Sequence, residues 1–141
     1  MIELFPYANI ISGVLVLIIG FVFHFIGQLI SVISWNQAVK LGIAEEEMLQ
    51  EYKDYELGMA MADVLIGWAY GFIGIGLILG TSWSFKLAWI PGVIFTYHGI
   101  SFWFWSRNQE NRGHKYRSTL GRVGWCMTNM ISGILIILVA W

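Results

Sequence analysis

The hydrophobic and polar positions along this chain fall into long blocks rather than alternating one by one. Four blocks are almost continuously apolar, at about residues 8–34, 59–80, 85–105 and 123–141. Each holds roughly the 20 residues that a helix needs to cross a bilayer. None shows the inside–outside alternation of a membrane β-barrel strand. The pattern predicts an all-α integral membrane protein with one domain (residues 1–141): a four-transmembrane-helix bundle with a short outer hairpin and two longer cytoplasmic loops.

The composition supports a membrane location and excludes several other classes. Of the 141 residues, 57% are hydrophobic and 12% are charged, whereas soluble domains carry about 25% charged residues. The formal net charge of −1 gives no basic surface for nucleic acid, so the expected partner is the lipid bilayer. Cys126 is the only cysteine, which excludes an intrachain disulfide and a cysteine-based zinc site. The first apolar block lacks a basic leader and a small-residue cleavage site, and we interpret it as a retained anchor.

The basic residues are distributed unevenly between the two sides of the predicted bundle. Seven of the eight lie in the two long loops: Lys40, Lys53, Arg107, Arg112, Lys115, Arg117 and Arg122. Only Lys86 lies on the other side. The positive-inside rule therefore predicts cytoplasmic long loops and both termini outside. The tryptophans form two expected interfacial belts, an outer one of Trp83, Trp89 and Trp141 and an inner one of Trp35, Trp103, Trp105 and Trp125, with Trp68 left inside the second span.

Two local features qualify the helix boundaries. The acidic stretch at about residues 44–57 predicts a cytoplasmic helical extension of the second span. Its carboxylates match no known metal-ligand spacing and favour a solvated helix face. In the third span, Pro91 either occupies the first turn of the helix or kinks its interior by removing one backbone hydrogen bond. If the helix begins at Pro91, the preceding residues form an interfacial re-entry segment.

Each predicted span carries at least one strongly polar side chain. The first has His24 and Gln28, four residues apart and hence on one face, and the others have Asp63, His98 and Asn129. At a rise of about 1.5 Å per residue, His24, Asp63, His98 and Asn129 lie about 18 to about 26 Å from the outer boundary. In a hydrocarbon core of about 30 Å, all four fall within one inner layer.

Facing lipid would be costly for these side chains, about 2.5–3.5 kcal/mol for a central aspartate. We therefore expect them to point inward and to satisfy one another. Gly67, Gly71 and Gly74 continue from Asp63 at near-helical spacing, which lets a neighbouring helix pack closely. Tyr70 lies beside this stripe and offers a hydroxyl. The candidate ligand- or ion-binding residues are accordingly His24, Gln28, Asp63, Tyr70, His98 and Asn129.

Several functions fit this arrangement. The first hypothesis is a small membrane protein whose polar core binds or conducts a proton, a cation or a compact ligand. Such a protein is expected to form a homo-oligomer, and the glycine stripe packs helices either within one protomer or between protomers. The second is a membrane redox subunit in which His24 and His98 are the axial ligands of a b-type haem. The third is a structural or assembly subunit of a larger membrane complex. A lipid-directed enzyme with histidine and aspartate as acid and base is a fourth, but no catalytic motif is present, which favours a non-enzymatic role.

Overall fold

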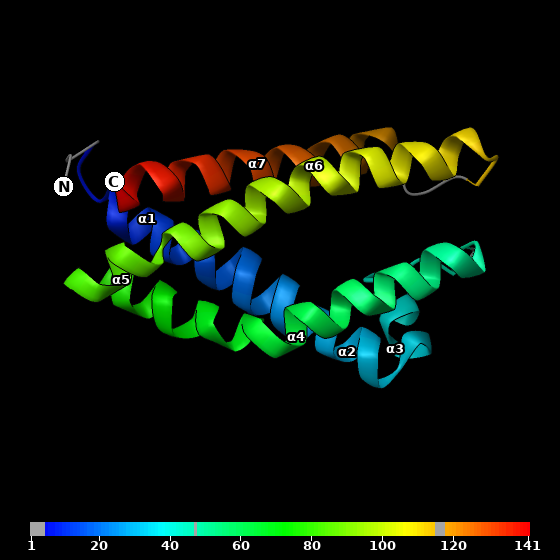
Figure 1. Cartoon of the computed structure of the whole chain (residues 1–141), viewed down its shortest axis with the longest axis horizontal. Helices are drawn as coiled ribbons and strands as arrows, with labels where there is room; N and C mark the ends of the chain where they lie inside the picture. Colours follow the sequence, from blue (N-terminus) through cyan, green and yellow to red (C-terminus); the bar gives the residue numbers. More distant parts are fainter. Residues whose placement is uncertain (1–4, 47, 115–117) are drawn as a thin grey trace.

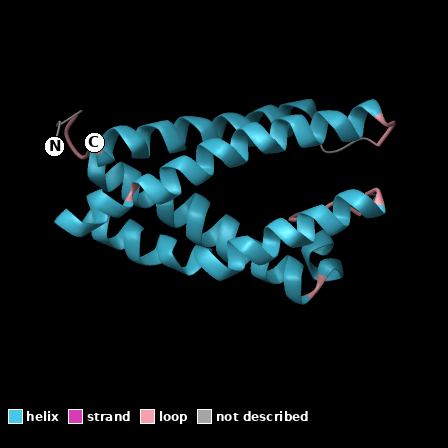
Figure 2. Ribbon diagram, in the orientation of Figure 1, coloured by secondary structure: helices cyan, strands magenta, loops and turns pink. Residues whose placement is uncertain are grey.

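The computed structural model describes residues 5–46, 48–114 and 118–141, and these residues form helices and connecting turns without any strand. Long helices run side by side, and the described part of the chain begins and ends at the same end of them (Figure 1). The ribbon coloured by secondary structure shows helix along nearly the whole described chain (Figure 2). In chain order the elements are α1 (Ala8–Leu15), the π-helical η1 (Val16–Gly27), α2 (Gln28–Ile33), α3 (Trp35–Lys40), α4 (Gln50–Ile78), α5 (Ser82–Leu87), α6 (Trp89–Asn111) and α7 (Thr119–Ala140).

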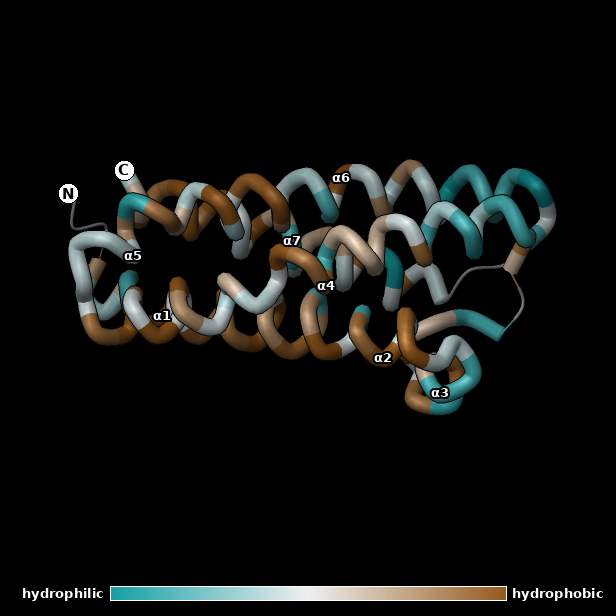
Figure 3. Tube along the Cα trace, turned by 60° about the horizontal axis from the view of Figure 1, so that its bottom comes forward, coloured by the Kyte–Doolittle hydropathy of each residue, from teal (hydrophilic) through white to brown (hydrophobic). Residues whose placement is uncertain are grey.

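Three helical segments are long and apolar enough to cross a membrane: Ala8–Ile33, Gln50–Ile78 and Thr119–Ala140. They correspond to the first, second and fourth expected spans. The third expected span lies in α6, which has 23 residues but does not reach the apolarity of the other three. Its tryptophan, tyrosine and histidine side chains replace the aliphatic residues that dominate the other segments. In Figure 3, hydrophobic residues line the long helices and hydrophilic ones gather at the end that carries α3.

The first long segment combines three elements, of which η1 is a π-helix of 12 residues. The apolar pattern predicts an uninterrupted helix here, because a segment that is apolar all round does not distinguish α from π geometry. The segment ends at Ile33, where Ser34 adopts an extended backbone with φ −155°. The Ser34 hydroxyl then accepts a hydrogen bond from the backbone N–H of Gln37 at 3.4 Å and caps α3.

The acidic extension begins later than the pattern predicts. Helix α4 starts at Gln50, and residues 44–46, 48 and 49 lie outside any helix. The backbone N–H groups of Ile43 and Ala44 both donate to the carbonyl of Ala38, at 2.9 and 3.3 Å. These two bonds fold the chain back onto α3, so the helix cannot extend through residue 44. From Gln50 onward, the extension and the second span form one continuous helix.

The remaining ends follow local backbone chemistry. Trp89 is the first residue of α6, so Pro91 lies in its first turn, where its missing N–H has no partner to lose. The first-turn interpretation of Pro91 is thus confirmed, and the preceding segment contains the short helix α5.

At its far end, α6 continues past the apolar block and stops before Gly113, whose φ of 84° suits glycine. Helix α7 begins four residues earlier than expected because the Ser118 hydroxyl caps it.

Close approach of helix backbones organises the two helix pairs. A Cβ atom on Gly133 of α7 would lie 2.6 Å from the carbonyl oxygen of Gly92 on α6. One on Gly13 of α1 would lie 2.6 Å from the carbonyl oxygen of Gly74 on α4. Between the pairs lies an apolar core formed by Val16, Ile19, Tyr70, Ile73, Leu77, Ala88, Phe95 and Ile136.

We expect Gly133→Ala to lower the free energy of unfolding by about 1–3 kcal/mol, because the new methyl group must push α6 and α7 apart. Gly124→Ala on the same helix is the matched control, since a Cβ there meets no atom within 4 Å. Reversible unfolding of the purified protein in detergent measures both. Equal stability of the two variants would contradict the close packing of α6 on α7.

Candidate functional site

His24 lies at the centre of the polar layer and is 1% exposed. Its Nε2 is 3.0 Å from Oδ1 of Asn129 on α7, and its Nδ1 is 3.5 Å from Oδ2 of Asp63 on α4. Asn129 is itself fully buried. One imidazole from η1 thus connects the two other strongly apolar helices.

The hydrogen-bond pattern fixes where protons lie in this cluster. Asn129 Nδ2 donates to the backbone carbonyl of Trp125 at 3.0 Å. A carbonyl only accepts, so the amide must turn its Oδ1 toward His24, and His24 Nε2 must carry a hydrogen. The other ring nitrogen faces the carboxylate of Asp63. A hydrogen bond between Nδ1 and the carboxylate needs a hydrogen on one of the two atoms.

His98 adds the fourth helix to the cluster. Its ring meets that of His24 edge to face, with centroids 4.3 Å apart and an interplanar angle of 82°. Trp125 Nε1 donates to His98 Nε2 at 3.3 Å, so the imidazole accepts at Nε2 and is neutral in this arrangement. The expected convergence of His24, Asp63, His98 and Asn129 is therefore confirmed by these contacts.

The other two predicted residues have different positions. Gln28 lies one turn beyond His24 and lines a pocket beside the cluster. Its Oε1 is buried and accepts no hydrogen bond from the described part of the chain. Tyr70 is 1% exposed and packs in the apolar core, with its ring centroid 5.7 Å from that of Phe95. Gly20 leaves the space for this ring, so Tyr70 joins the core and does not line the pocket.

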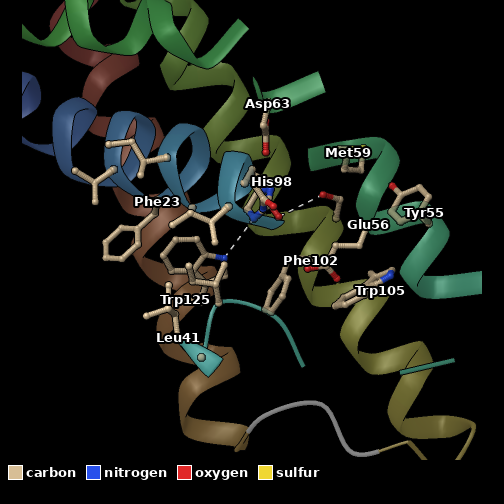
Figure 4. A pocket seen from close by; sticks show the side chains of 18 residues that line it. Phe23, Leu41, Tyr55, Glu56, Met59, Asp63, His98, Phe102, Trp105 and Trp125 are labelled. Carbon is tan, nitrogen blue, oxygen red and sulfur yellow. Dashed lines mark hydrogen bonds between the residues drawn. The ribbon is translucent and has the colours of Figure 1, made fainter. Parts of the chain in front are cut away.

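A pocket of about 470 Å³ adjoins the cluster. Asp63 and His98 form part of its wall, together with Glu56. Figure 4 shows these three side chains around the same space, with aromatic rings among them. The full lining comprises Val22, Phe23, Ile26, Gly27, Gln28, Ile30, Leu41, Gly42, Ile43, Tyr55, Glu56, Met59, Asp63, His98, Ser101, Phe102, Trp105 and Trp125.

Trp125 is the site residue that the sequence pattern assigns elsewhere, to an interfacial belt. In the structure it bonds His98, lines the pocket, and supplies the carbonyl that orients Asn129. Its position four residues before Asn129 places both on one face of α7, which is the signal that could have identified it. No comparable feature of the sequence indicates that Glu56 and Phe102 line the pocket.

The paired histidines do not fit a haem in this arrangement. A metal–imidazole bond is about 2 Å long, so two axial nitrogens lie about 4 Å apart and their ring centres farther still, with a flat macrocycle between them. The His24 and His98 rings instead touch each other, and the ring nitrogens of His24 face Asn129 and Asp63. Among the described residues, no group of three or more His, Cys, Asp or Glu side chains could hold a metal ion.

Comparisons of this chain with protein families, with curated proteins and with solved structures find no match. Any functional assignment therefore depends on the chemistry of the His24 cluster and of the pocket beside it.

A double-mutant cycle tests the central hydrogen bond. We expect His24→Phe and Asn129→Leu to show a coupling energy between about 0.6 and about 1.7 kcal/mol, the mean and the maximum measured for hydrogen bonds between helices in a membrane protein. The control cycle pairs His24→Phe with Gln50→Ala. Gln50 is the first residue of α4, and its side chain donates a hydrogen bond to Asp54. Unfolding in detergent gives each free energy. Coupling no larger than in the control cycle would show that the bond does not form.

Proposed function

We propose that this chain is a small membrane protein with four membrane-spanning helices, in which the pocket beside His24 binds a compact ligand. Three helices of sufficient length and apolarity support the membrane location. Helix α6 is the proposed fourth span because it packs along α7 through Gly92 and Gly99. A Cβ atom on Gly99 would lie 2.9 Å from the carbonyl oxygen of Cys126, so the two helices run in close contact well beyond their first turns.

The proposed orientation places the termini outside and the long loops in the cytoplasm. Two observations support it: the start of α1 and the end of α7 lie together at one end of the helices (Figure 1), and hydrophilic residues gather at the opposite end (Figure 3). There Arg112 forms an ion pair with Glu51, and Lys53 lies 5.0 Å from the ring centroid of Trp35. Of the seven basic residues that favour this orientation, Lys115 and Arg117 lie outside the described residues.

The pocket is the observation that carries the binding proposal. Its volume falls in the range of small-molecule sites, about 300–1,000 Å³, and its wall is mostly apolar with a few polar groups, as in such sites. Residues 41–43, in the loop between α3 and α4, form part of the wall. A ligand would thus enter from the cytoplasmic side and meet Asp63 and His98 at the level of the buried cluster.

The orientation is tested by cysteine labelling in a Cys126→Ala background. In intact cells, a membrane-impermeant maleimide should label Lys86→Cys. It should label Lys40→Cys and Arg112→Cys only after the membrane is permeabilised, because those positions are cytoplasmic. Labelling of either of the latter two from outside in intact cells would overturn the orientation.

The binding proposal is tested with three small probes that share a benzyl group: benzyltrimethylammonium, benzyl alcohol and benzylsulfonate. We expect at least one to raise the unfolding temperature of the protein saturably, because a ligand that binds only the folded state stabilises it. His98→Phe should leave the helices intact and abolish this response, since it replaces a polar group of the pocket wall.

The matched control is Tyr97→Phe, which introduces the same side chain at the adjacent position on the exposed face of α6. It should keep the full response. A His98→Phe variant that responds as strongly as Tyr97→Phe would refute a role for His98 in binding. If the variant is only less stable, by about 1–2 kcal/mol, and still responds, His98 is a structural hydrogen-bond acceptor.

A further inference from the structure

We propose that the ligand of this pocket is a compact organic cation, an ammonium group attached to an apolar body. The proposal rests on the ligand-binding function above and specifies its chemical class. Three features of the pocket support it: the sign of its charged groups, its aromatic side chains, and the apolar character of the rest of its wall.

The charged groups of the wall are all acidic. Asp63 and Glu56 contribute carboxylates, and the lining residues include neither lysine nor arginine. His98 is the one basic side chain in the lining, and its Nε2 accepts a hydrogen from Trp125, which is the neutral form of the ring. The buried Oε1 of Gln28 adds another acceptor without a donor in the described part of the chain. A positively charged donor complements this set, whereas an anion would face the carboxylates of Glu56 and of Asp63, the second of which lies 3.5 Å from Nδ1 of His24.

Aromatic side chains supply the second feature. The faces of such rings attract cations, and cages of rings recognise quaternary ammonium groups. Trp125 of α7 lies beside His98 in the wall of the pocket. Phe102 and Trp105 follow His98 on α6 by one and two turns (Figure 4). The ring centroids of Phe102 and Trp105 are 5.7 Å apart. The aromatic residues of the wall are Phe23, Tyr55, Phe102, Trp105 and Trp125.

The remaining wall distinguishes an organic cation from a metal ion. Hard metal cations need several oxygen ligands in a closed cage, and the described residues hold no group of three or more His, Cys, Asp or Glu side chains suited to one. The pocket is instead completed by aliphatic residues and methionine, namely Val22, Ile26, Ile30, Leu41, Ile43 and Met59. Such a wall favours the apolar body of an amine over the water shell of a metal ion.

The test compares the affinities of the three benzyl probes for the protein in lipid nanodiscs, measured by ligand-observed NMR titration. The three share the aromatic group and differ in charge. Benzyltrimethylammonium should bind at least about tenfold more tightly than benzyl alcohol, and benzylsulfonate should not bind, because of the two carboxylates.

Two variants assign the preference to the pocket. Asp63→Asn should weaken benzyltrimethylammonium binding by about tenfold and leave benzyl alcohol unchanged, since it removes the charge and keeps a side-chain oxygen that can face His24 Nδ1. Asp54→Asn is its control: the same substitution on the same helix at an exposed position outside the pocket, with no expected effect. Glu56→Gln removes the charge of the other carboxylate in the wall without changing the partner of His24. It should weaken cation binding by about threefold or more.

The outcomes separate the two proposals. If benzyl alcohol or benzylsulfonate binds as tightly as benzyltrimethylammonium and the binding is lost in His98→Phe, the pocket binds ligands but the cation assignment is wrong. An equal affinity of Asp63→Asn and Asp54→Asn for the cation, with Glu56→Gln also unchanged, overturns the assignment as well. If none of the three probes binds the wild-type protein, both the cation assignment and the proposed function fail.

Discussion

An imidazole enclosed in apolar surroundings must find a partner for each ring nitrogen, because an unsatisfied polar group there costs several kcal/mol. His24 meets this constraint with a side-chain oxygen from α7 at Nε2 and one from α4 at Nδ1. Both partners are fixed: the Asn129 amide is turned by the carbonyl of Trp125, and Asp63 is buried. The requirement of one ring thus sets the positions of η1, α4 and α7 relative to one another. The same positions leave a pocket on the side where His98 closes the cluster.

Glycine at the helix contacts makes this geometry possible. The side chains of His24, Asp63 and Asn129 are short, so their helices must approach closely for the oxygens and nitrogens to meet. On either side of the cluster, the ring of Phe25 fills the space that a side chain at Gly67 would occupy, and the backbone of Gly92 fills that of Gly133. The half of the structure that carries α1 and α5 is then an apolar core around Tyr70 and Phe95. The other half combines the polar cluster and the pocket.

Depth along the chain was sufficient to predict which residues meet. Residue counting places four polar side chains at one depth, namely His24, Asp63, His98 and Asn129. Because exposing any of them to lipid would cost free energy, depth and this cost together predict that they converge. Counting does not give the rotation of each side chain about its helix. Tyr70 is a candidate for its place beside the glycine stripe, but the space at Gly20 takes its ring into the apolar core.

Other features depended on contacts that a linear pattern does not contain. Trp125 was assigned to the membrane interface because tryptophan is common there, yet its indole N–H reaches His98. The late start of α4 at Gln50 follows from two backbone bonds to Ala38, and the early start of α7 from the Ser118 cap. The π-helical geometry of η1 cannot be predicted from the sequence, because a segment that is apolar on every side fits an α-helix equally well.

Solid-state NMR of isotopically labelled protein in lipid bilayers observes the central imidazole directly. The account predicts a His24 Nε2–H whose proton correlates with the side-chain carbonyl carbon of Asn129. It also predicts that the ring resonances of His98 shift when benzyltrimethylammonium saturates the pocket. A His24 ring that exchanges its protons with bulk water and shows no correlation to Asn129 would contradict the account, as would His98 resonances that the probe leaves unchanged.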